Sequence, residues 1–156
     1  MSVWKPKKKS TNKFSAKVTT KKLLAAVLSS LTFSVSAQTY LQVNGASLHD
    51  QSGYNQFNYG LGVEKTMSKD WNIAAGWYRN SEYRGSAYVY GRYSLYQSGA
   101  MDLGVGVGII TGYQRAAVIP MAFPEACYSY ICALFVPKIE NTGANVLGFH
   151  LKIPVN

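Results

Sequence analysis

The sequence predicts an all-β protein: an eight-stranded antiparallel up-and-down β-barrel of the transmembrane type, following an N-terminal signal peptide. Three observations predict it. The basic residues concentrate in a leader with the parts of a secretory signal. The rest of the chain alternates large apolar residues with small or polar ones, in runs of about the ten residues that a membrane-spanning strand needs. Glycine is frequent in the small and polar phase.

The leader covers residues 1–37 and precedes one domain, residues 38–156. Lysines up to Lys22 are followed by an apolar run from Leu23 to Val35, and cleavage is expected after Ala37. The run is shorter than the roughly 20 residues of a membrane-spanning helix. An uncleaved anchor is the alternative. A mature chain of 119 residues is long enough for one domain and too short for two cores.

The net charge of +9 belongs to the leader, because basic residues exceed acidic ones by only one after residue 37. A nucleic-acid partner is therefore not expected. A basic leader followed by strands indicates export and a place in a bacterial outer membrane.

The predicted strands are 39–49, 57–66, 70–80, 85–97, 100–113, 118–128, 131–138 and 145–154. Turn residues such as Ser68-Lys69-Asp70 and Gln97-Ser98-Gly99 separate them. In chain order, the alternating apolar positions include Tyr59, Leu61 and Val63; Trp71, Ile73, Ala75 and Trp77; Ala87, Val89, Tyr93 and Leu95; Met101, Leu103, Val105, Val107 and Ile109; and Leu147, Phe149, Leu151 and Ile153.

Alternation alone does not show whether the apolar side chains face outward, toward lipid, or inward, toward a core. A soluble β-barrel or sandwich therefore remains the alternative. Glycine weakens a strand and is rare on a solvated face, whereas the crowded interior of a narrow barrel favours it. Aromatic residues recur near strand ends, as in an interfacial girdle. In a barrel, Arg92, Tyr88 and Tyr90 would face a polar lumen and pair with Glu64 and Asp102.

An up-and-down barrel brings the connections after strands 1, 3, 5 and 7 to one rim. His49 and Ser81, the residues best suited to acyl transfer, then share that rim with the basic residues Arg79, Arg84, Arg115 and Lys138. Cations at this level suit phosphate-bearing lipid headgroups. A solvated histidine, an Asn-Ser turn and plain surface charges are the alternatives.

Cys127 and Cys132 are spaced to bridge the two arms of a tight hairpin in an oxidising compartment. Two buried or lipid-facing thiols are the alternative. The chain has two histidines, both far from these cysteines in sequence, so neither a metal nor another cofactor is expected.

The ordered segments Ser47-Leu-His49, Asn58-Tyr-Gly60-Leu-Gly62-Val-Glu64, Gly76-Trp-Tyr-Arg-Asn-Ser81, Leu103-Gly-Val-Gly-Val-Gly108 and Phe135-Val-Pro137 resemble the PagP-like family, the outer-membrane lipid A palmitoyltransferases and their uncharacterised relatives. The resemblance covers about residues 47–152. It implies a monomer whose partners are phospholipid and lipid A. A non-enzymatic structural or lipid-binding barrel is the alternative.

The resemblance also implies roles for individual residues. His49 would be the general base. Asn80, where the family has aspartate, would orient it or steady the developing charge, and Ser81 would supply a hydroxyl or an oxyanion donor. An acyl pocket would lie along Gly60, Gly62, Gly104, Gly106 and Gly108, unless these glycines make room for Tyr88, Tyr90 and Arg92. A lateral gate would lie at Pro120, Pro124 and Pro137.

Strand phase sets one further condition. His49 shares its alternation phase with Leu41 and Val43, so it can face the lumen only if a bulge interrupts the first strand.

Overall fold

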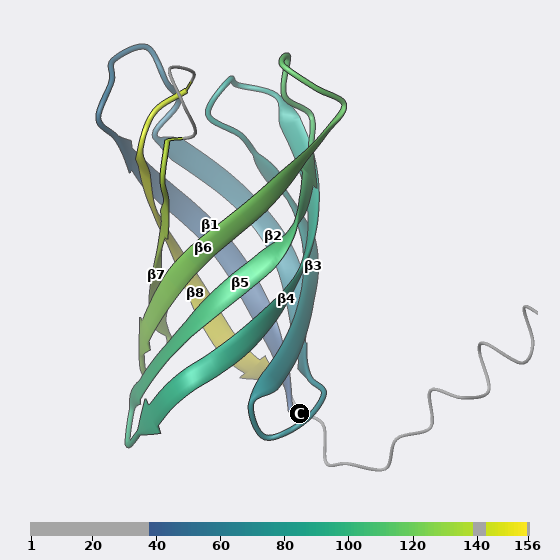
Figure 1. Ribbon diagram of the computed structural model, residues 1–156, viewed down its shortest axis with the longest axis vertical. Helices are drawn as coiled ribbons and strands as arrows, with labels where there is room; N and C mark the ends of the chain where they lie inside the picture. The colour runs from purple at the N-terminus through teal and green to yellow at the C-terminus, as the bar shows by residue number, and fades with distance from the viewer. Residues whose placement is uncertain (1–37, 139–142, 156) are drawn as a thin grey trace, which may run out of the picture. The chain divides into compact units, whose positions relative to one another are not determined.

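The computed structural model describes residues 38–138 and 143–155, which form a closed barrel of eight strands (Figure 1). The strands are β1 (Thr39–His49), β2 (Phe57–Thr66), β3 (Trp71–Arg79), β4 (Gly85–Ser98), β5 (Met101–Thr111), β6 (Val118–Tyr128), β7 (Ile131–Val136) and β8 (Val146–Val155). The predicted signal peptide lies outside the described residues. The fold class predicted from the sequence is confirmed.

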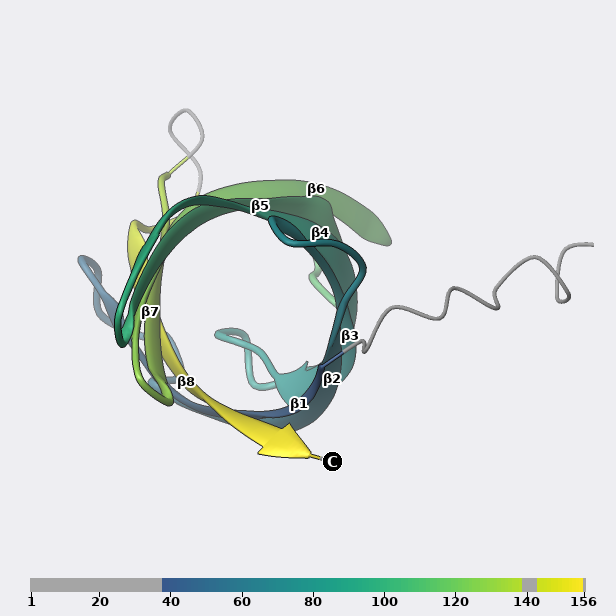
Figure 2. The same ribbon diagram turned by 90° about the horizontal axis from the view of Figure 1, so that it is seen from below.

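Every strand pairs antiparallel with its neighbour in sequence, and β1 also pairs with β8 to close the ring, as the view along the barrel shows (Figure 2). The connections after β1, β3, β5 and β7 lie at one end, which we call the loop rim. The tight turns between β2 and β3, β4 and β5, and β6 and β7 lie at the other end, the turn rim (Figure 1). The up-and-down topology thus gathers the loops as the sequence predicted.

The layout of a soluble protein is reversed. Val107 and Leu61 on the outer face are 65% and 60% exposed, while Arg92 and Glu64 in the interior are completely buried. Leu103, Val105 and Val107 face outward, and Gly104 and Gly106 are buried. An apolar outer face with a polar interior is the arrangement of a transmembrane-type barrel, since a soluble sandwich would bury the apolar phase.

Buried charges in the lower half of the lumen are paired. Arg92 Nη1 lies 2.9 Å from Asp102 Oδ2, and Lys152 Nζ lies 2.6 Å from Glu64 Oε1. The Nε of Arg92 also contacts Oε2 of Glu125. The expected pairing of Arg92 with Asp102 is confirmed, whereas Glu64 takes Lys152 as its partner. Such pairs are required because an uncompensated buried charge costs several kcal/mol.

Neutral hydrogen bonds complete this cluster. Gln42 Nε2 donates to Glu64 Oε2 at 2.8 Å and to the Tyr90 hydroxyl at 2.6 Å, while the Tyr88 hydroxyl donates to Gln42 Oε1 at 2.9 Å. Together, these buried polar groups form one connected cluster inside the barrel. We call this cluster the polar plug, and its members are Gln42, Glu64, Tyr90, Arg92, Asp102, Glu125, His150 and Lys152.

A β-bulge in β1 explains how His49 reaches the lumen. The register of β1 shifts between Asn44 and Ala46 against both β2 and β8. Below the bulge Gln42 is buried, and above it the buried position is Ser47, while Leu48 is 54% exposed. The extra residue therefore switches which alternation phase faces inward, as the phase condition required.

Candidate functional site

A cavity of about 620 Å³ occupies the upper half of the lumen, between the polar plug and the loop rim. Its size falls within the roughly 300–1,000 Å³ typical of small-molecule sites. The side formed by β5, β6 and β7 is apolar, and that wall consists of Ile110, Ile119, Met121, Phe123, Leu134 and Val136. The opposite side carries polar groups from β1 to β4, including Asn44, Ser47, Asn58, Tyr78 and Tyr88. The cavity therefore has one apolar wall and one wall that carries hydrogen-bonding groups.

Aromatic rings form the floor of the cavity. Tyr90 meets the edge of Phe123 with ring centroids 5.1 Å apart, and it stacks on Tyr88 at 5.8 Å. A Cβ added at Gly106 would run into the Phe123 ring, and one added at Gly62 would meet the Tyr88 hydroxyl. These glycines are thus needed because the aromatic side chains lie directly against the backbone at Gly62 and Gly106.

The remaining predicted pocket glycines behave in the same way. A Cβ added at Gly60 would meet Tyr78, one at Gly104 would meet the Arg92 guanidinium, and one at Gly108 would meet Tyr90. None of the five glycines lines the cavity. This placement fits the alternative in which they make room for large inward side chains, and the apolar wall takes their place as the candidate acyl-chain surface. Its sequence signal is a stretch, residues 119–124, that is apolar in both alternation phases.

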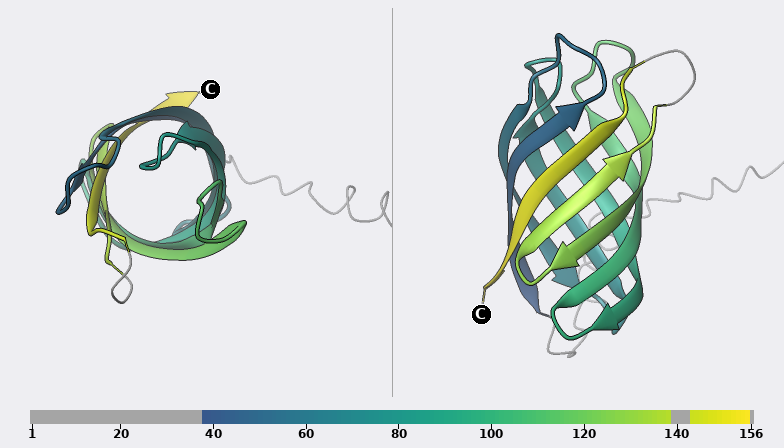
Figure 3. Two further views of the ribbon diagram at one scale, coloured as in Figure 1. Left: turned by 90° about the horizontal axis from the view of Figure 1, so that it is seen from above. Right: turned by 90° about the vertical axis from the view of Figure 1, so that its left-hand side faces the viewer.

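The strands β6 and β7 diverge toward the loop rim (Figure 3), and the cavity is lined by residues of both strands there. In the described residues, β6 pairs with β5 along its whole length but with β7 only from Glu125↔Leu134 to Tyr128↔Ile131. Pro120 and Ala122 belong to the outward phase of β6 yet line the cavity, so it reaches the outer face there.

The three predicted gate prolines lie around this opening. Pro124 directly follows the last β6–β7 pair toward the loop rim, and Pro137 directly follows the last residue of β7. Pro120 and Pro137 line the cavity, whereas Pro124 does not. Proline ends ladders because it has no N–H to donate.

His49 and Ser81 both line the mouth of the cavity. The His49 ring stacks on Tyr54 with centroids 5.0 Å apart, and neither ring nitrogen has a hydrogen-bond partner among the described residues. The backbone carbonyl of Ser81 accepts a hydrogen bond from the Asn55 N–H at 2.8 Å. The structure thus brings the two predicted residues to one opening, without a hydrogen bond between them.

Asn80 is not part of this mouth. Its side chain is completely buried inside the β3–β4 loop, where Nδ2 donates to Ser86 Oγ at 2.9 Å and to the Gly112 carbonyl at 3.1 Å. Its Oδ1 accepts from the backbone N–H groups of Glu82 and Arg84, both at 2.9 Å. Asn80 therefore organises the loop, in the manner of an Asx turn.

The predicted headgroup cations divide into two groups. Arg115 lines the cavity mouth, together with Lys138. Arg79 donates from Nη1 to the Tyr59 hydroxyl at 3.3 Å, and neither it nor the exposed Arg84 lines the cavity. A phosphate at the mouth would meet the first group.

Two further features are a tyrosine pair that was not predicted from the sequence and a disulfide that was one of two alternatives. The hydroxyls of Tyr78 and Tyr113, both at the cavity, lie 3.0 Å apart. Cys127 and Cys132 form a disulfide between directly paired positions of β6 and β7, as one of the two sequence alternatives held.

Comparison with known proteins shows the fold and no family. No family model matches the chain, and no curated protein matches it. The chain resembles the solution NMR structure of a de novo designed transmembrane β-barrel, TMB2.3, with a TM-score of 0.54 and 13% identity over 76% of this chain and 96% of that one. The described residues include no helix with the length and apolarity to cross a membrane.

Proposed function

We propose that this protein is an outer-membrane barrel that binds the acyl chain of a membrane lipid in its upper cavity. One observation carries the proposal: the apolar wall of the cavity is continuous with an opening toward the outer face between β6 and β7. An acyl chain lying along the outer face could enter there without crossing water. The buried polar plug lies below the cavity, so we expect an acyl chain that enters to remain in the upper half of the lumen.

The mouth supports the choice of a phosphate-bearing lipid. Arg115 and Lys138 line it, and guanidinium and ammonium groups bind phosphate oxygens through charge-assisted hydrogen bonds. A lipid with its chain in the cavity and its headgroup at the loop rim would satisfy both ends. Phospholipid and lipid A both have this chemistry.

Photolabelling with a phospholipid that carries a diazirine in its acyl chain tests the binding proposal. Residues of the outer belt, such as Val89, will be labelled in any membrane barrel. If the acyl chain binds in the lumen, inward-facing residues are labelled as well, and Met121 and Leu134 are the diagnostic sites. Met121→Trp fills the cavity and should suppress inward labelling while belt labelling persists. Labelling confined to the belt in folded wild-type protein would refute the proposal.

Acyl transfer is the second candidate function, favoured by the shared position of His49 and Ser81 at the mouth. In that reaction, a lipid A hydroxyl attacks the phospholipid ester and the lysophospholipid leaves. His49 would take the proton of the attacking hydroxyl and return it to the leaving alkoxide. The Ser81 hydroxyl would donate a hydrogen bond to the developing oxyanion. Asn80 is occupied within its loop and has no part in this proposal.

Mass spectrometry of lipid A from cells that make the folded barrel tests transfer. The expected product carries one additional acyl chain, and His49→Ala should abolish it. Ser81→Ala should lower it, since removal of one oxyanion donor costs about 10²–10³ in rate. Unmodified lipid A alongside positive lumen photolabelling would leave the protein as a lipid-binding barrel without transferase activity.

A further inference from the structure

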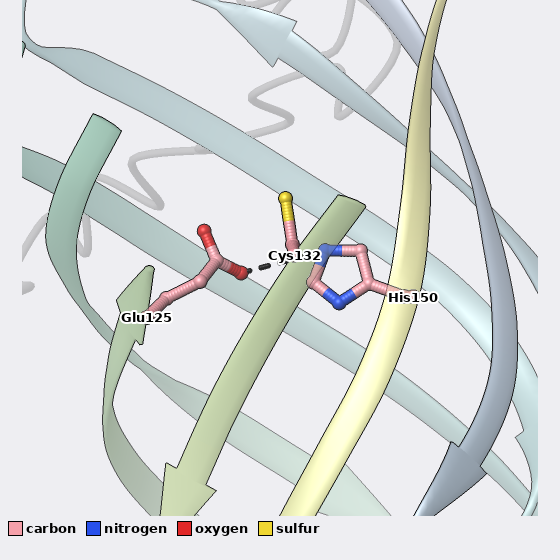
Figure 4. A group of neighbouring side chains, drawn as sticks. All are labelled: Glu125, Cys132 and His150. Carbon is pink, nitrogen blue, oxygen red and sulfur yellow. Dashed lines mark ion pairs between the residues drawn. The ribbon is translucent and has the colours of Figure 1, made fainter. Parts of the chain in front are cut away.

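Three inward residues form one row across three adjacent strands near the turn rim. Cys127 of β6 is paired with Cys132 of β7, and Cys132 is paired with His150 of β8. Glu125 precedes Cys127 by two residues and therefore points to the same face of β6. All four side chains are buried. Figure 4 shows Glu125, Cys132 and His150 converging from these strands.

Two buried atoms in this cluster lack hydrogen-bond partners. Oε2 of Glu125 contacts Arg92, but Oε1 of Glu125 and Nε2 of His150 have no hydrogen bond within the described part of the chain. These two atoms face each other as an ion pair at 3.5 Å, and one ligand atom of each of Glu125, Cys132 and His150 lies within 4.8 Å of the others. Buried polar atoms are normally satisfied, so this pair requires an explanation.

The spacing matches the edges of a zinc coordination tetrahedron. Zinc lies about 2.0–2.2 Å from histidine nitrogen and carboxylate oxygen, so two such ligands of one ion are roughly 3.4 Å apart. The observed separation between His150 and Glu125 is 3.5 Å. Arg92, bound to the other oxygen of Glu125, would hold that carboxylate in orientation, as outer partners of metal ligands commonly do.

The sulfur atoms decide when such a site exists. In the disulfide neither sulfur is a thiolate, the form in which cysteine binds zinc. We propose that reduction of the Cys127–Cys132 bond creates a zinc site whose ligands are Cys127, Cys132, His150 and Glu125. A water-soluble phosphine would reduce the bond, with water, to two thiols and become the phosphine oxide. Zinc would then displace two thiol protons into solvent.

Charge in the polar plug permits this exchange. The plug contains three carboxylates, Glu64, Asp102 and Glu125, against two permanent cations, Arg92 and Lys152. One Zn²⁺ with two thiolates adds no net charge relative to the neutral disulfide, so the existing ion pairs need not rearrange. The Asp102 side chain is 26% exposed, which gives water access to the plug.

Cobalt titration of the phosphine-reduced barrel in detergent tests the proposal, with folding verified by heat-modifiable gel migration. We expect one Co²⁺ per chain, with a sulfur-to-cobalt charge-transfer band and the visible bands of tetrahedral cobalt, and displacement by zinc. Cys132→Ser and His150→Ala should weaken binding at least tenfold. His49→Ala is the matched control, because His49 is the chain's other histidine and lies at the loop rim, and it should leave cobalt binding unchanged.

A second measurement uses the oxidised protein as purified. If zinc binds only the dithiol form, zinc must raise the reduced fraction at equilibrium in a glutathione redox buffer of fixed composition, relative to a chelator control. Absence of cobalt binding by the folded, reduced barrel would overturn the proposal. Equal binding by the disulfide form, or by His150→Ala, would overturn it as well, since the thiolates and the imidazole would then not be ligands.

Discussion

The structure predicts that the change of Asn80 to aspartate destabilises the β3–β4 loop. The substitution replaces one NH₂ group by an oxygen. That NH₂ group donates to Ser86 Oγ and to the Gly112 carbonyl, at 2.9 and 3.1 Å. Aspartate at neutral pH has no proton to offer to either.

The two lost bonds differ in consequence. The Ser86 hydroxyl can rotate and donate to the new carboxylate, so that contact survives. The Gly112 carbonyl cannot, and it would face a charged oxygen at a buried position. Leaving one buried acceptor unsatisfied costs about 1–3 kcal/mol. Stronger acceptance from the N–H groups of Glu82 and Arg84 offsets part of the charge burial. We expect a net loss of about 1–3 kcal/mol in the free energy of unfolding.

Equilibrium urea unfolding in detergent micelles, followed by tryptophan fluorescence, measures this loss. The deficit should shrink as the pH falls, because the protonated carboxyl regains one donor for Gly112. Ser81→Ala is the matched control in the same loop and should change the free energy of unfolding by less than about 0.5 kcal/mol. Equal stability of Asn80→Asp and wild type at neutral pH would refute the structural role assigned to Asn80.

Three further outcomes follow from the barrel interior. Gly106→Ala should cost about 1–3 kcal/mol in urea unfolding, since its Cβ enters an aromatic ring on β6, while Gly91→Ala, whose Cβ has only an ordinary contact, should not. Arg92→Gln should cost about 3–5 kcal/mol by the same assay, because it leaves buried carboxylates without their cation. Replacing Pro120 and Pro124 together by alanine should extend the β6–β7 ladder and slow acyl-chain labelling of the cavity several-fold; an unchanged time course would count against lateral entry.

Most of the fold could be predicted from the sequence because the membrane imposes a strict alternation on each strand. The predicted boundaries differ from the observed ones by at most two residues at either end of each strand. Phase also set the condition that His49 could face the lumen only through a bulge in β1, and the register places that bulge between Asn44 and Ala46. The largest deviations are in β5 and β7, which end two residues early, β7 directly before Pro137.

The site was less predictable because it depends on register and on side-chain direction. Topology placed His49 and Ser81 at one rim, but which way Asn80 turns is decided by hydrogen bonds to residues on other strands. The row that joins Cys132 to His150 is set by the β7–β8 register, which sequence separation does not reveal. Cavity position likewise follows from which inward side chains are large enough to fill the lumen.

The opening between β6 and β7, where the two strands are not paired, is the feature that most needs a functional reason. Unpaired backbone groups in a bilayer cost several kcal/mol each, so a purely structural barrel should close its wall. The β5–β6 ladder runs through both Pro120 and Pro124, which is possible only where the missing N–H would point away from β5, toward the opening. The prolines thus remove two donors that the opening would leave unsatisfied. They lower the cost of keeping the opening while preventing the ladder from closing it. The prolines thus reduce this cost beside an apolar cavity that lies above a buried charged cluster. This arrangement is the one expected if selection favoured movement of a ligand between the cavity and the membrane.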